Sequence, residues 1–164
     1  MLALEEVIRW VHQDYRHAAL LAPTFKQNDI SLPALNEEYF LDERELGILA
    51  RHPLVSIGGH TTSHAALPTL DKFLARAELV DNRGYLENLI QLPVRHLAYP
   101  YGDWGHREEN LTNEAGFQTA VTTQQGRLND NKVNRFALPR IGVYSRSGFM
   151  ARMSGIIEAV QLLR

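Results

Sequence analysis

The sequence contains no cysteine among its 164 residues. Disulfides, thiolate metal sites and cysteine nucleophiles are therefore excluded, and His, Asp and Glu remain as the strong metal ligands. An excess of one charge is also missing, because 17 basic and 19 acidic residues leave a formal net charge of -2. Since no basic stripe is present to bind phosphate backbones, we do not expect nucleic acid as a partner.

Long uninterrupted apolar runs are absent as well. The first 22 residues carry an apolar stripe, but charged and imidazole side chains interrupt it every few residues. This pattern fits neither a signal peptide nor a membrane span. We therefore expect an amphipathic helix and no membrane span, with a cytoplasmic location if Met1 is the true start and an undetermined one otherwise.

What the sequence does contain is enough apolar material for one core. With 45% hydrophobic and 22% charged residues, the chain has the composition of a single soluble domain. We assign residues 1–164 to that one domain.

Hydrophobic periodicity predicts helices alternating with strands. Asp42 is the predicted N-cap of one short helix, and Gly116 the predicted end of another. Residues 22–41, with two prolines and no sustained period, are expected to be a surface connection. The predicted helices cover about 3–22, 43–52, 70–92, 108–114 and 147–163, the first with a core-facing stripe, and the predicted strands cover 54–57, 94–99, 117–123 and 137–145.

Alternating strands and helices favour right-handed βαβ units and a parallel α/β sheet. Four strands are too few to close a barrel, and a complete (β/α) barrel needs at least about 200 residues. The chain is therefore expected to be either an open sheet or the C-terminal part of a longer barrel.

Two histidines follow the first predicted strand, in the segment His60-Thr61-Thr62-Ser63-His64. Ligand sites of parallel α/β folds lie at the carboxyl ends of the strands. Imidazoles four residues apart can share a divalent ion on one side of a helical turn. Such a pair also arises by chance, as caps or as solvated loop residues.

Two further strand ends carry polar or aromatic groups. Tyr99-Pro100-Tyr101-Gly102-Asp103-Trp104 follows the second predicted strand, and its Pro and Gly are suited to a fixed turn. Turns of this kind with aromatic packing occur in any fold. The fourth predicted strand carries Arg140, which is equally suited to a structural ion pair.

In order, the segments IGGHTTSHAALPTL, VRHLAYPYG, GFQTAVTT and LPRIGV resemble the polysaccharide deacetylases, the NodB-homology group also called carbohydrate esterase family four. The similarity runs from about Leu41 to Tyr144. It implies a partial (β/α) barrel of the NodB type with parallel strands, the N-terminal strands missing. It also implies a hydrolase acting on carbon–nitrogen bonds other than peptide bonds, which removes acetyl groups from N-acetylated or O-acetylated polysaccharides and oligosaccharides.

The resemblance assigns roles by position. His60 and His64 match two ligands of an Asp-His-His metal site, usually zinc, and Tyr101 matches the tyrosine whose backbone N–H stabilises the oxyanion. Arg140 is expected to replace the arginine of the Tyr-Pro-Tyr motif, whose position holds Ala98. Substrate contacts are expected from three residues, which are Tyr99, Pro100 and, by stacking on a sugar ring, Trp104.

The departures from the family pattern concern catalysis. No Asp-Asp pair occurs in the sequence, although the family's first motif uses one as general base and third metal ligand. We weigh Asp103 and Asp71 as substitutes for that ligand. No histidine follows His106, so the family's late histidine, the general acid in many members, has no counterpart.

These departures leave three readings open. The first is a deacetylase impaired in this chain, and the second is a catalytically inactive carbohydrate-binding or structural remnant. The third is an unrelated α/β domain in which HTTSH is an ordinary loop, which divergent His60 and His64 side chains would indicate. An incomplete barrel also leaves a sheet edge uncovered, so we expect a homo-oligomer, a swapped segment or poor solubility.

Overall fold

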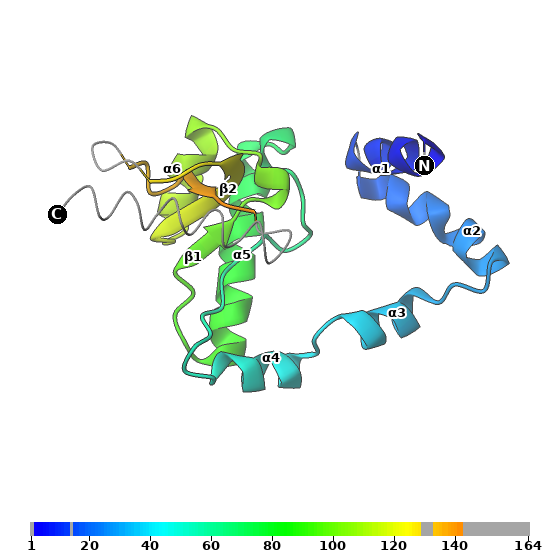
Figure 1. Cartoon of the computed structure of the whole chain (residues 1–164), viewed down its shortest axis with the longest axis horizontal. Helices are drawn as coiled ribbons and strands as arrows, with labels where there is room; N and C mark the ends of the chain where they lie inside the picture. The colour runs from blue at the N-terminus through cyan, green and yellow to red at the C-terminus, as the bar shows by residue number, and fades with distance from the viewer. Residues whose placement is uncertain (1, 14, 129–132, 143–164) are drawn as a thin grey trace, which may run out of the picture.

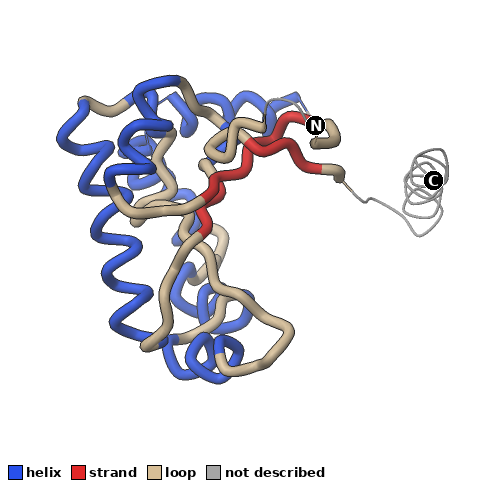
Figure 2. Tube along the Cα trace, turned by 90° about the vertical axis from the view of Figure 1, so that its left-hand side faces the viewer, coloured by secondary structure: helices blue, strands red, loops and turns tan. Residues whose placement is uncertain are grey.

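The protein contains a narrow sheet of three parallel strands (Figure 2). The computed structural model describes residues 2–13, 15–128 and 133–142. The strands are β1 His96–Ala98, β2 Thr119–Gln125 and β3 Leu138–Arg140, in the order β1-β2-β3. Leu97 is opposite Ala120, and Val121 is opposite Leu138.

Helices connect and precede the strands. The α-helices are α1 Leu2–Gln13, α2 Ala22–Gln27, α3 Leu32–Tyr39, α4 Glu43–Ala50, α5 Lys72–Ile90 and α6 His106–Glu114. The 3₁₀ turns are η1 Tyr15–Leu21, η2 Leu67–Thr69 and η3 Pro100–Gly102. The predicted helices over 70–92 and 108–114 are confirmed by α5 and α6.

The core joins α5 and α6 to the sheet. Leu79 of α5, Leu111 of α6 and Ala120 of β2 are almost completely buried in one apolar cluster with Leu97 of β1. Each of these leucine side chains stabilises the fold by about 1.5–3 kcal/mol through removal from water. The sheet, α5 and α6 therefore form one packed unit, here called the body, which positions the strand ends.

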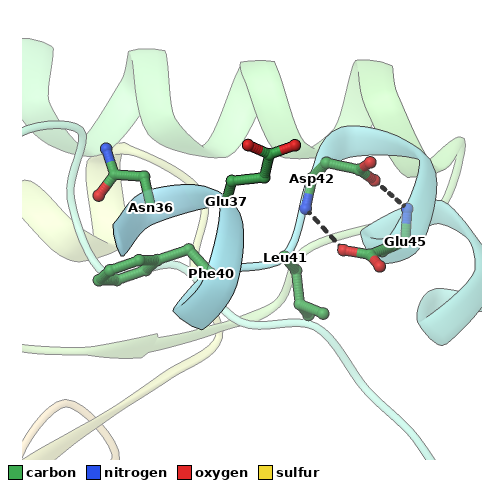
Figure 3. A pocket seen from close by; sticks show the side chains of 6 residues that line it. All are labelled: Asn36, Glu37, Phe40, Leu41, Asp42 and Glu45. Carbon is green, nitrogen blue, oxygen red and sulfur yellow. Dashed lines mark hydrogen bonds between the residues drawn. The ribbon is translucent and has the colours of Figure 1, made fainter. Parts of the chain in front are cut away.

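The start of helix α4 was predicted correctly, although the helix ends at Ala50, two residues before the predicted end. Asp42 Oδ1 accepts a hydrogen bond from Glu45 N at 2.6 Å, and Asp42 N donates to Glu45 Oε2 at 3.1 Å (Figure 3). This capping box satisfies two donors of the first turn of α4. Tyr85 of α5 donates to Glu43 Oε1 at 2.6 Å and so attaches α4 to the body.

Helices α1, α2 and α3 form an N-terminal arm outside the body (Figure 1). Val7 and Ile8 are 39% and 45% exposed, so the prediction that the first helix faces the core is wrong for these residues. The connection predicted over 22–41 is wrong in its local structure, because it contains α2 and α3. Pro23 and Pro33 stand in their first turns, where the missing N–H costs nothing, and Ser31 caps α3.

The predicted strand over 54–57 is not formed. Leu54 is 89% exposed, and only Gly59 reaches β1, through a single parallel bridge to Leu97. Gly59 N donates to His96 O at 2.8 Å, and Ala98 N donates to Gly59 O at 2.9 Å. The described residues contain no strand on the other side of this segment that would hold it extended.

The parallel sheet with its connecting helices confirms the predicted α/β class. The fourth predicted strand corresponds to β3, which is shorter than predicted because it covers only Leu138–Arg140 and residues 141 and 142 are not strand. The rest of that prediction, over 143–145, and the helix predicted over 147–163 lie outside the described residues. Within the described ranges, no helix is both long and apolar enough to cross a bilayer.

Candidate functional site

The histidine segment meets the Tyr101 turn at the carboxyl end of β1. The bridge between Gly59 and Leu97 places His60 beside the end of that strand, and η3 follows it directly. The ring centroids of His60 and His64 are 4.7 Å apart, with an angle of 72° between the ring planes. The two imidazoles are therefore in edge-to-face contact.

The orientation of His60 is fixed by the backbone of β1. Its Nδ1 lies 2.6 Å from the carbonyl oxygen of Ala98, and because a carbonyl only accepts, Nδ1 must donate. In the neutral ring, this leaves the lone pair on Nε2. Histidine ligands of metals are commonly held in this way, with one ring nitrogen donating and the other binding the ion.

His64 contacts the side chain of Tyr101. Its Nδ1 lies 2.9 Å from the Tyr101 hydroxyl, and the rings meet edge to face with centroids 4.8 Å apart. Burial, followed by the charge of Asp103, raises the pKa of Tyr101 above its usual range. The phenol thus stays protonated at neutral pH and holds the second imidazole in place.

Helix α5 binds the segment between the two histidines. Glu78 accepts from Thr62 N and Ser63 N, both at 2.8 Å, and from Ser63 Oγ at 2.6 Å. Asn82, one turn later, accepts from His60 N at 3.1 Å. Sequence reasoning missed both residues, since polar side chains four apart on a helix usually indicate a solvated face.

Three residues of the site have left-handed backbones. The φ angles are 67° at Thr61, 58° at His64 and 59° at Tyr101. A residue other than Gly in this region costs about 1–3 kcal/mol, and a β-branched one is a clear outlier. Such strain persists only where the surroundings hold the backbone, and it often accompanies function.

The Tyr101 turn is fixed against β2. Gly102 has φ 75°, and a Cβ there would lie 2.2 Å from Thr123 Oγ1. Thr123 Oγ1 also donates to Tyr101 O at 3.1 Å. Close backbone approach therefore requires glycine at this position, and the turn joins the carboxyl ends of β1 and β2.

Three residues predicted to contact substrate belong to the packing of this turn. Tyr99 is 1% exposed, and its hydroxyl lies 3.2 Å from Thr112 Oγ1. Pro100 is also buried, and Trp104 is half-buried against the core. The side chains of Tyr99 and Pro100 therefore pack inside the protein at this turn.

Arg140 lies two strands away from β1. Its Nε donates to the Thr122 carbonyl oxygen at 2.5 Å, and the side chain lines a hollow of about 300 Å³ with Thr123 and Gln125. No hydrogen bond or ion pair between described residues connects Arg140 to the His60–His64 segment. The guanidinium is held by β2 instead.

Neither aspartate weighed as a third ligand joins the two histidines. Asp71 caps α5 by accepting from Leu74 N at 2.9 Å. In the described part of the chain, no three His, Asp or Glu side chains are grouped so as to hold a metal ion. These residues therefore supply two imidazoles, a type of ligand that zinc accepts, without a third ligand grouped with them.

A larger hollow lies away from this site. Residues of α3, of α4 and of the connection between them, among them Phe40 and Glu45, line a volume of about 710 Å³ (Figure 3). Asp42 and Glu45 are bound to each other's backbone there. Convergent imidazoles are a better indicator of chemistry than the size of a cavity, so we place the candidate site at the His60–His64 segment.

Comparisons with known proteins agree with this architecture. The sequence profile of the family described as Polysaccharide deacetylase matches residues 23–120. This is more than half of the chain, which therefore belongs to the polysaccharide deacetylase family, as the resemblance implied. No curated protein sequence matches the chain significantly.

Solved deacetylase structures share the fold. The deacetylase PplD of Streptococcus pyogenes, in complex with acetate, matches with a TM-score of 0.63 and 19% identity over 79% of this chain and 61% of that one. BC0361, a polysaccharide deacetylase from Bacillus cereus, matches with a TM-score of 0.62 and 22% identity over 68% of this chain and 36% of that one. The BpsB deacetylase domain of Bordetella bronchiseptica matches with a TM-score of 0.54 and 18% identity over 63% of this chain and 49% of that one. The chain thus spans about one to two thirds of these structures.

Proposed function

We propose that this chain carries part of the active site of a hydrolase that removes acetyl groups from N-acetylated or O-acetylated polysaccharides. The observation that supports this proposal is the contact between the His60 and His64 rings, whose centroids are 4.7 Å apart, beside Tyr101 at the carboxyl end of β1. Family membership supports the reaction class.

His60 and His64 are the proposed ligands of a divalent ion, for which imidazole nitrogen favours zinc. When bound, such an ion polarises the acetyl carbonyl and lowers the pKa of a coordinated water. His60 offers Nε2 because its Nδ1 donates to Ala98 O. The Tyr101 hydroxyl orients His64, and the Tyr101 N–H is the proposed donor to the negative charge that develops on the carbonyl oxygen.

The remaining proposed contacts surround this centre. Trp104, half-buried beyond the turn, would offer the exposed part of its ring to a sugar. Arg140, in the hollow with Thr123, is the proposed replacement for the family's arginine. Tyr99 and Pro100 would act through the shape of the turn, because their side chains are buried.

We also propose that this chain alone has weak activity. Its sequence has no Asp-Asp pair to supply a general base, and positioned proton transfer contributes about 10²–10⁴-fold to rate. A binding or structural role without catalysis is the second candidate, favoured by the lack of a three-ligand group among the described residues. Glycan binding without acetate release would support that alternative.

Zinc titration of the purified chain tests the proposed centre. We expect binding of one ion by the unaltered chain and a loss of affinity in His60→Ala larger than the about 10–100-fold caused by changes around a ligand. His106→Ala is the matched control, since that side chain is 99% exposed and His106 lies outside the segment. Equal affinities in His60→Ala and the unaltered chain would exclude the metal pair.

A further inference from the structure

Glu78 of α5 is surrounded by donors from the segment that links the two histidines. Oε2 accepts from two successive backbone amides, Thr62 N and Ser63 N, each at 2.8 Å, while Oε1 accepts the Ser63 hydroxyl at 2.6 Å. Thr62 Oγ1 also lies 3.4 Å from the Glu78 carbonyl oxygen, to which it donates. The Glu78 carboxylate thus accepts from both backbone amides and from the Ser63 hydroxyl, in the segment between His60 and His64.

The segment needs such support because of its backbone. Thr61 and His64, on either side of the residues that Glu78 binds, both have left-handed φ angles. Thr61 is 6% exposed, and its Oγ1 has no hydrogen-bond partner among the described residues. The conformation is therefore unfavourable locally and depends on contacts from other elements.

Asn82 supports the same segment from the next turn of α5. Its Oδ1 accepts from His60 N at 3.1 Å, and residues four apart in a helix share one face. A Cβ added to Gly59 would lie 3.0 Å from that oxygen, so the chain passes close to the helix here. Glu78 and Asn82 together bind the start and the middle of the histidine segment.

We propose that Glu78 is a positioning residue that sets the separation of the His60 and His64 rings. The proposal rests on the proposed function, in which these rings bind a metal ion. Glu78 acts through the backbone and not as a ligand, because both carboxylate oxygens already accept hydrogen bonds from the segment. Without the carboxylate, the left-handed residues relax and the two imidazoles lose their edge-to-face contact.

Glu78→Gln is the direct test, since it keeps the size of the side chain but turns one acceptor into an amide donor facing amide donors. We expect zinc affinity to fall about 10–100-fold, the range seen when supporting contacts around a ligand are removed. Asp81→Asn is the matched control, because it removes the same charge from an exposed position of the same helix. The control should bind zinc as the unaltered chain does.

A readout without metal separates this proposal from the proposed function. In the metal-free chain, Glu78→Gln should speed hydrogen exchange of the Thr62 and Ser63 amides at least about tenfold, whereas the Ala98 amide of β1 should be unaffected. If zinc binds equally well to His60→Ala, the metal pair fails, but the exchange rates still measure the hold of Glu78 on the segment. Unchanged exchange and unchanged zinc affinity in Glu78→Gln would overturn the positioning role.

Ser63→Ala provides a second variant if Glu78→Gln does not fold. It removes only the hydroxyl bond to Oε1 and leaves both amide bonds to Oε2. A weakening of zinc binding by several-fold is expected from this loss of one of the three donors. Full affinity in Ser63→Ala would count against the proposal.

Discussion

Tyr99 illustrates how a residue within a functional motif serves the core. Its ring is 1% exposed among the apolar residues of β1, α5 and α6, and its hydroxyl contacts Thr112. Burial raises its pKa to about 12, although the hydrogen bond to Thr112 lowers it in part. The neutral phenol is thus strongly favoured in the folded state.

The raised pKa of Tyr99 predicts a loss of stability at high pH. Below pH 10 the phenol is neutral in both states, so its contribution is complete there. Between pH 10 and about 12 only the unfolded state ionises, and the free energy of unfolding should fall by up to about 3 kcal/mol. Urea unfolding of the unaltered chain and Tyr99→Phe at pH 9 and pH 11.5 measures this effect.

Tyr99→Phe should be less stable by about 1 kcal/mol at pH 9, because it lacks the bond to Thr112, and more stable at pH 11.5. Tyr39→Phe, at a side chain that is 69% exposed, is the control and should show no such reversal. A constant difference between the unaltered chain and Tyr99→Phe at both pH values would contradict the prediction.

At the scale of single elements, the η3 turn depends on one glycine. Gly102 combines a positive φ with contact against Thr123, where a Cβ would lie 2.4 Å from the backbone nitrogen. Gly102→Ala should lower the free energy of unfolding by at least about 1–3 kcal/mol, from backbone strain alone. Chemical denaturation of the purified variant measures the loss.

Gly84→Ala is the matched control for this substitution. Gly84 lies within α5, and a Cβ there meets no atom within 4 Å. Since Ala is the better helix former, this variant should gain about 0.5–1 kcal/mol. Equal effects of the two substitutions would show that the turn does not require glycine.

The elements that sequence predicted well are those whose signal is local. The length and period of α5, with Asp71 before it, suffice to define a helix. The spacing of His60 and His64, which predicts a metal pair, is likewise a local signal. The strand over 54–57 was not predictable in this way, since an extended segment needs a partner that its own residues do not reveal.

The supports of the candidate site were beyond sequence reasoning for the same reason. Glu78 is 15 and 16 positions from the residues it binds, and only the packing of α5 beside the segment brings them together. The carbonyl of Ala98 fixes His60, although a backbone acceptor has no sequence signature at all. Pro33 favoured the prediction of a connection without helix, but it stands in the first turn of α3.

At the scale of the whole molecule, the arm exposes apolar surface. Exposed apolar side chains on α1 and α3 are Val7, Ile8, Trp10, Leu32, Leu35 and Tyr39. The outer edge of β1 is also paired only at Gly59 among the described residues. Surfaces of both kinds tend to be covered by another chain.

We therefore expect the chain to self-associate reversibly. Sedimentation velocity should show a mass that rises with protein concentration, and Ile8→Glu should weaken association at least about tenfold, because burying one Ile contributes about 1.5–3 kcal/mol. Glu5→Gln, on the same helix, is the control for a change that leaves the apolar side chains in place. A stable monomer at all concentrations would contradict the expectation.

The order β1-β2-β3 in the sheet is also the order of the strands along the chain. Each strand thus finds its neighbour by closing one crossover, β1 to β2 through α6, with no threading past an earlier strand. During synthesis, β2 and β3 each emerge after a strand with which they pair. The sheet can accordingly form one strand at a time in chain order, and each added strand covers the open edge of the strand before it.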